Sequence, residues 1–135
     1  MLEAGLYSLL TGDATLAALI GTRLFPVMVN EHDMPVNAGD PSCVSYQVVA
    51  GSTTYTLEPT QYSDRRIQFD IWSVKYSDSK SIAQAIRNVL SGYSGVLTDG
   101  TQVLSALQEN EIDDFESDSR IFRVMSEYRI RFIEP

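Results

Sequence analysis

RRIQFDIWSVKYSDSKSIAQAIRNVLSG, residues 65–92, is the clearest strand-then-helix unit of the chain. Ile67, Phe69 and Ile71 alternate with polar side chains, which predicts a strand with one buried face. After this strand the apolar residues follow helical spacing instead, at Ile82, Ala85, Ile86, Val89 and Leu90. Ser77 or Asp78 is placed to cap the helix and Gly92 to end it. We expect the strand and the helix to fold against each other and the rest of the chain to add to that layer.

The residues before this unit predict two short helices, a loop and a strand. The helices are expected over residues 1–10 and 14–20, the second capped by Asp13 and ended by Gly21. A short edge strand at residues 24–27 precedes residues 28–41, which have no sustained period and predict a long exposed loop. A strand over residues 43–50 should then continue through residues 51–62, with a turn at Glu58-Pro59, and pair with the strand that starts at Arg65.

The residues after the unit predict two more strands. Asp99-Gly100 is a hairpin turn pair, and a strand follows it over residues 102–108. The longest strand is expected over residues 120–133, after an acidic segment at residues 109–118. The whole order predicts an α+β fold in one domain, residues 1–135: an antiparallel sheet with helices packed on one face, a protruding β-hairpin and a long loop.

The composition fits a globular protein that does not bind nucleic acid freely. Of 135 residues, 44% are hydrophobic and 21% charged, and no apolar run approaches the ~20 residues of a membrane-spanning helix. The net charge of −8 disfavours binding to phosphates. The single cysteine, Cys43, and the lack of a signal-peptide pattern favour synthesis in a reducing cytoplasm.

Three groups of residues are candidates for contacts with partners. The first is the polar face of the two longest strands, which needs a cover and holds the candidate subunit interface: Asp70, Trp72, Arg123, Arg129 and Arg131. The second lies on the predicted loop and hairpin, which are suited to reach a neighbour: Glu31, His32, Asp33, Tyr55 and Tyr62. The third is the acidic segment, which is either a solvated turn or a negative patch facing a pore or a basic partner: Glu111, Asp113, Asp114, Glu116 and Asp118.

No catalytic or metal-binding constellation can be assembled from the sequence. His32 is the only histidine and is interpreted as a solvated loop residue, and Cys43 has no second cysteine at zinc-finger spacing. The acidic segment lacks the glycine and the spacing of an EF-hand loop, and no glycine-rich phosphate loop follows a strand. We therefore expect neither an enzyme nor a bound cofactor or metal.

Four stretches together resemble the small tail completion (tail-to-head joining, or tail terminator) proteins of long-tailed bacteriophages. They are MLEAGLYSLLTGDATLAALIGTRLFPVMV, PSCVSYQVVAGSTTYTL, RRIQFDIWSVKYSDSKSIAQAIRNVLSGYSG and FRVMSEYRIRFIE. They cover nearly the whole chain and follow one another in the same order as in that family. The resemblance rests on their sum, since no single motif is specific. The helix start at residues 76–80, YSDSK, departs from the family pattern because it lacks an alanine.

The resemblance implies a structural virion protein without a catalytic site. Such a protein forms an oligomeric ring, usually a hexamer, at the head-proximal end of the tail tube. The ring stops polymerisation of the tube protein and joins the tail to the head connector or stopper protein, and genomic DNA passes through its lumen without specific binding. The alternatives are a head-side connector or stopper protein, a small cytoplasmic hydrolase and a cytoplasmic ligand-binding domain.

Overall fold

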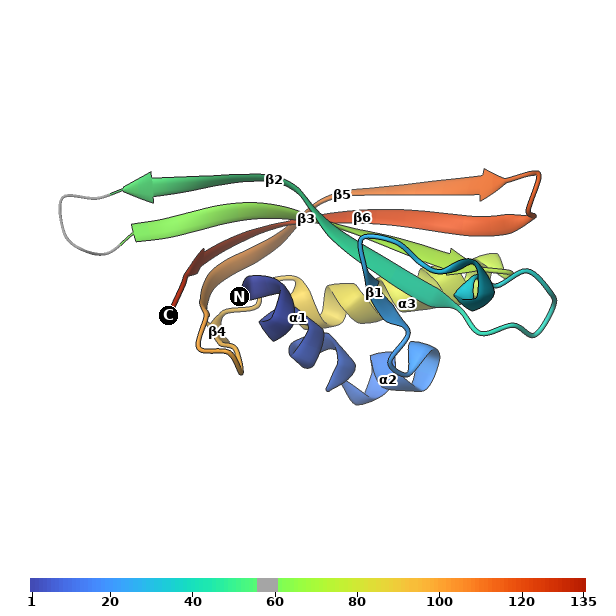
Figure 1. Ribbon diagram of the computed structural model, residues 1–135, viewed down its shortest axis with the longest axis horizontal. Helices are drawn as coiled ribbons and strands as arrows, with labels where there is room; N and C mark the ends of the chain where they lie inside the picture. Colours follow the sequence, from blue (N-terminus) through green and yellow to red (C-terminus); the bar gives the residue numbers. More distant parts are fainter. Residues whose placement is uncertain (56–60) are drawn as a thin grey trace.

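The computed structural model describes residues 1–55 and 61–135, apart from the side chain of Gln61. Its helices are α1 (Leu2–Thr11), α2 (Ala14–Ile20), α3 (Tyr76–Leu90) and a short 3₁₀ helix, η1 (Glu31–Asp33). A six-stranded sheet has the order β1-β2-β3-β6-β5-β4, with β1 (Leu24–Pro26), β2 (Cys43–Tyr55), β3 (Gln61–Ser73), β4 (Gly95–Val96), β5 (Gln102–Glu116) and β6 (Ile121–Ile133). The three α-helices lie on one side of this twisted sheet (Figure 1), which confirms the predicted α+β class.

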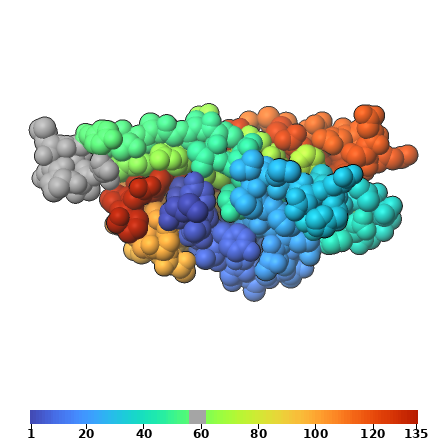
Figure 2. All heavy atoms as spheres, in the orientation of Figure 1, coloured from blue at the N-terminus to red at the C-terminus, as the bar shows by residue number. Residues whose placement is uncertain are grey.

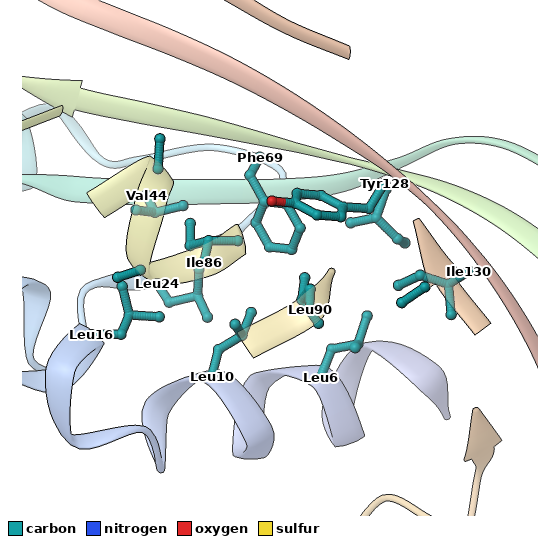
Figure 3. Close-up of a cluster of buried hydrophobic side chains, with 14 of the residues drawn as sticks. Leu6, Leu10, Leu16, Leu24, Val44, Phe69, Ile86, Leu90, Tyr128 and Ile130 are labelled. Carbon is teal, nitrogen blue, oxygen red and sulfur yellow. The ribbon is translucent and has the colours of Figure 1, made fainter. Parts of the chain in front are cut away.

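The central unit forms as its two periods predict. Ile67, Phe69 and Ile71 of β3 are buried, and they face the apolar side of α3. Figure 3 shows Phe69 beside Tyr128 of β6, above Ile86 and Leu90 of α3 and the leucines of α1. The core therefore lies between the sheet and the helices, and the opposite face of the sheet carries mostly polar residues.

The ends of the helices agree with the sequence except at one position. The Asp13 carboxylate accepts a hydrogen bond from the Leu16 amide at 2.9 Å, and Gly21 and Gly92 have the positive φ angles expected after a helix. The cap predicted for α3 is wrong, because the helix begins at Tyr76 and its N-cap position is Lys75, without a side-chain cap. Ser77 and Asp78 consequently lie inside the first turn.

The sheet is mixed, whereas the sequence analysis predicted an antiparallel one. β1 runs parallel to β2, with Leu24 opposite Val44 and Pro26 opposite Tyr46. Parallel neighbours need a crossover of about a dozen residues or more. The long segment between Pro26 and Cys43 supplies this connection, which is why the chain can return to start β2 beside β1.

The acidic segment is a strand and not the solvated turn considered above. β5 runs on through it to Glu116 and pairs with β6 as far as Glu116 opposite Ile121. Bulges between Val103 and Ser105 and between Gln108 and Asn110 let one strand continue past the core. We call this far part of the hairpin, residues 110–116 with 121–127, the β5–β6 arm.

The predicted hairpin of β2 and β3 is the second arm of the sheet. The two strands pair from Cys43 opposite Trp72 to Tyr55 opposite Gln61, with a bulge after Val48. We call residues 50–55 with 61–66 the β2–β3 arm; the turn predicted at Glu58-Pro59 lies outside the described residues. The two arms extend from the core toward opposite ends of the molecule (Figures 1 and 2), so the chain can make contacts in two directions.

Candidate functional site

The five residues of the candidate interface share one surface of the sheet. β3 and β6 are central neighbours, with Trp72 opposite Arg123 and Arg66 opposite Arg129. Alternation turns the buried residues of both strands toward the helices, so the intervening polar residues occupy the side away from them. We call this side the outer face. The structure thus brings Asp70, Trp72, Arg123, Arg129 and Arg131 together over the two middle strands.

One end of the outer face is organised around the Asp70 carboxylate. Asp70 is only 5% exposed, and its Oδ1 lies 3.0 Å from Nη2 of Arg123 and 3.0 Å from Nε2 of Gln68. The Arg123 guanidinium also lies 4.8 Å from the centre of the Trp72 ring, within cation–π range. Asp70 is therefore already paired within the chain, and Trp72 lies beneath an arginine.

The other end of the outer face carries a looser network of ion pairs. Oδ1 of Asp64 lies 3.1 Å from Nε of Arg131 and 3.7 Å from Nε of Arg129. The Arg131 guanidinium also lies over the ring of Tyr62. Arg66 lies 3.2 Å from Glu109 and is about half exposed, as are Arg129 and Arg131. Because these guanidinium groups keep contact with solvent, they are accessible to a carboxylate of a neighbour.

The predicted loop does not simply point away from the rest of the chain. Val29 and Met34 turn back over the outer face, where they line a hollow of about 330 Å³ together with Trp72 and Arg123. Sequence reasoning missed this cover, although the apolar residues scattered through the loop were a signal for it. Glu31, His32 and Asp33 form η1, and the His32 side chain is 81% exposed, with Nε2 3.4 Å from Asp33.

The acidic residues are distributed over both sides of β5. Glu111 and Asp113 face α3, whereas Asp114 pairs in register with Arg123 on the opposite side, Glu116 ends the strand, and Asp118 lies in the turn before β6. Lys80 Nζ lies 2.9 Å from Glu111 and 3.0 Å from Asp113, and Arg87 Nη2 lies 2.8 Å from Glu111. Only some members of the predicted patch remain free for a partner.

The contacts with α3 shift the ionisation of this cluster. Burial by itself would raise the pKa of Glu111, but hydrogen bonds and charges from Lys80 and Arg87 outweigh it and hold that pKa below its ordinary value. A hydrogen bond donated by Tyr76 at 2.6 Å, and another from Lys80, lower the pKa of Asp113. The hydrogen bond to Glu111 raises the pKa of Lys80.

These shifts make the stability of the α3–β5 contact depend on pH. A lowered carboxyl pKa stabilises the fold above the ordinary pKa, 4.5 for Glu111, and this stability is lost as the pH falls through the folded value. A raised lysine pKa stabilises the fold below the ordinary value of 10.5 and is lost as the pH rises through the folded value. The cluster is therefore fully stabilising between these limits.

We expect Glu111→Gln to lower the free energy of unfolding at pH 7 by about 1 kcal/mol and to flatten its decline below pH 4.5. Urea denaturation between pH 3 and pH 7 measures both effects. Asp118→Asn is the matched control. Asp118 is exposed in the turn, and its substitution removes the same charge from the same hairpin. If the free energy of unfolding of Glu111→Gln declined below pH 4.5 as steeply as that of the wild type, this assignment would be contradicted.

The described part of the chain has no group of three or more His, Cys, Asp or Glu side chains arranged to hold a metal ion. Burial raises the pKa of the Cys43 thiol to about 12, so the thiol stays protonated at neutral pH. Among the described residues, no helix is both long and apolar enough to cross a membrane.

Comparisons with known proteins agree with the geometry of the fold. The family model "Tail completion protein gp17" matches residues 4–133. A chain of the solved structure "Virion of native gene transfer agent (GTA) particle" superposes with a TM-score of 0.73, covering 98% of this chain and 94% of that one. At 20% identity this likeness shows a shared fold. A search of curated protein sequences finds no match. Since the family match covers nearly the whole chain, the protein belongs to the tail completion protein gp17 family of structural tail proteins.

Proposed function

We propose that the protein forms a ring, a hexamer by the family resemblance, at the head-proximal end of the tail tube. There it stops addition of the tube protein and joins the tail to the connector or stopper protein of the head. The family match over residues 4–133 is the observation that carries this proposal. The fold supports it with two opposed arms and with half-exposed arginines on the outer face, both suited to contacts with neighbouring subunits.

The charge of the protein supports a lumen through which DNA moves without sticking. The net charge is −8, and Glu111 and Asp113 are already neutralised by Lys80 and Arg87. Asp114, Glu116 and Asp118 have no lysine or arginine partner among the residues described, so we assign the repulsion of phosphate to them. Glu31, His32 and Tyr55 are exposed, and Asp33 and Tyr62 are half-buried. All five remain candidates for contacts with the tube protein or the connector.

Removal of the protein tests the proposal directly. Particles made without it should contain tubes of excess length that are not attached to heads, because nothing ends polymerisation. Electron microscopy of the tails measures both properties, and wild-type protein supplied during assembly should restore defined lengths. Tails of normal length in its absence would contradict tube termination.

Arg129→Ala separates assembly from folding in the same experiment. Its side chain is half exposed, so we expect an unfolding midpoint close to that of the wild type but reduced capping of tubes.

The rival function, a head-side connector or stopper, predicts that the protein is found on heads that lack tails. Its recovery on isolated tails favours the tail role instead.

A further inference from the structure

The sheet leaves two long strand edges open, one on each side. β1 pairs with β2 only as far as Tyr46, so residues 47–55 of β2 have no backbone neighbour on that side in the described chain. Among the described residues, β4 pairs with β5 only at Gln102 and Val103, and Gly92 donates a hydrogen bond to the Ala106 carbonyl at 2.8 Å. Residues 107–116 of β5 are consequently the second open edge. Open edges are templates for pairing with another chain.

The two edges are complementary in composition and similar in length. Residues 47–55, QVVAGSTTY, carry no charge, whereas residues 107–116, LQENEIDDFE, carry five carboxylates and no cation. Two β5 edges would bring like charges together, which is unfavourable, but a β5 edge beside a β2 edge avoids this. Both edges also expose apolar side chains, among them Val48 and Val49 on β2 and Ile112 and Phe115 on β5.

We propose that copies of this chain assemble head to tail by edge pairing, with residues 47–55 of one copy antiparallel to residues 107–116 of the next. The strand order β2-β3-β6-β5 makes β2 and β5 antiparallel within one subunit, so this pairing continues the antiparallel sheet from copy to copy. The inference rests on the proposed ring and identifies the surfaces that close it.

The alternation of side chains limits the register of the pairing. Val48 lies opposite Ile67 and Phe115 opposite Phe122, so both point to the helix side, and a slip of one residue would turn one of them to the wrong face. We place Val48 opposite Phe115, which sets Ser52 opposite Ile112 once the bulge after Val48 is taken into account. In this register the whole β2 edge, residues 47–55, lies alongside the β5 edge, which extends beyond it at Leu107.

An apolar hollow beside Val48 fits the Phe115 ring in this register. The hollow has a volume of about 820 Å³ and is lined by Ala4, Tyr7, Pro26, Val27, Tyr46 and Val48, among others. It lies on the helix side of β2, where Phe115 of the next copy would point. Phe115 is 46% exposed in the isolated subunit, so its burial in the hollow would add apolar contact area to the strand pairing.

The displacement between copies agrees with a closed barrel. Within one subunit the register aligns Val48 with Ile67, Tyr128 and Gln108 in a row perpendicular to the four strands. Between copies Val48 instead faces Phe115, which lies farther along β5 than Gln108. This is a shift of about six residues, or ~20 Å at ~3.3 Å per residue, across four strands spaced by ~4.8 Å. The ratio corresponds to a strand tilt of roughly 45°, at the upper end of the ~35–45° of closed barrels.

Cysteine cross-linking in a Cys43→Ala background tests the pairing and its register. Oxidation of Ser52→Cys/Ile112→Cys, on intact particles and on concentrated protein, should give a ladder of covalent oligomers that a reductant reverses. Each single variant should give none, and a mixture of the two should give only dimers. The control Ser52→Cys/Ser105→Cys joins positions that share a row in one subunit, so it should cross-link less than one-tenth as well.

Three results would overturn the inference: dimers from Ser52→Cys alone, which mean that two β2 edges meet; equal cross-linking by the control pair; or no ladder in either sample. Phe115→Asp should abolish the ladder while the protein stays folded by circular dichroism. Leu104→Asp, which likewise replaces an exposed apolar side chain of β5 by aspartate but lies outside the open edge, should keep it.

Tail lengths report the proposed function separately. Overlong tails without the protein together with absent cross-links would remove only the edge pairing, and a ladder with normal tails would remove only tube termination.

Discussion

Phe69→Ala should lower the free energy of unfolding by about 3–5 kcal/mol, the largest effect we expect from a single substitution. Phe69 is 1% exposed, and its ring meets that of Tyr128 edge to face, with centroids 5.7 Å apart. The change removes buried apolar surface and leaves a cavity between β3, β6 and α3. A domain of this size has only about 5–15 kcal/mol of stability, so a large part of it would be lost.

Urea denaturation followed by tryptophan fluorescence measures this effect, since Trp72 lies on the same strand. Ile86→Ala, on the facing side of α3, should cost about 2–5 kcal/mol for the same reason. Arg129→Ala is the control from the outer face of the sheet and should cost less than about 1 kcal/mol. Similar losses for Phe69→Ala and Arg129→Ala would mean that both sides of the sheet are core.

The core of this fold was readable from the sequence because it depends on local periods. The alternation around Phe69 and the helical spacing around Ile86 each identify a buried face without knowledge of the rest of the chain. Caps made by Asp13 and Gly21 were predictable for the same reason, since each acts within one turn. The α3 cap failed because two adjacent polar residues left its position ambiguous, and the helix begins without either as its cap.

Features that depend on long-range pairing were not predictable. The acidic β5 strand has low strand propensity, and it forms because β6 pairs with it and because Lys80 and Arg87 reach Glu111 from α3. Such cations lie far away in the sequence, so composition alone favoured a solvated turn. The parallel β1 depended likewise on where the long loop returns the chain.

The candidate interface was predicted as a set of residues but not as a network. Strand parity placed Asp70, Trp72 and Arg123 on one face, and the structure agrees. Parity does not say which side chains pair with one another, and here Asp70 forms an ion pair with Arg123 of the same chain. Substitutions of Asp70 or Arg123 therefore act on folding as well as on any neighbour, unlike substitutions of the half-exposed Arg129, and the two effects must be measured separately.

Arg123→Met is the second large effect, and we expect it to lower the free energy of unfolding by about 2–3 kcal/mol. The substitution leaves the nearly buried Asp70 carboxylate without its cation, at a cost of ~3–5 kcal/mol for a fully buried pair. Gln68 still donates to Asp70, and the Arg123 side chain is 25% exposed, so we place the loss below that range. Arg66→Met is the control, since Arg66 is half exposed and should cost less than about 1 kcal/mol.

The reverse substitution should be milder, because the two partners are not equally buried. Asp70→Leu frees Arg123, whose guanidinium can turn to solvent and keep its contact with Trp72. We expect Arg123→Met/Asp70→Leu to recover at least about 1 kcal/mol relative to Arg123→Met, since the unpaired carboxylate is then gone. A double-mutant cycle in urea measures this coupling. If Asp70→Leu were the costlier single change, or if the two losses simply added, burial of the Asp70 charge would not be what makes Arg123 necessary.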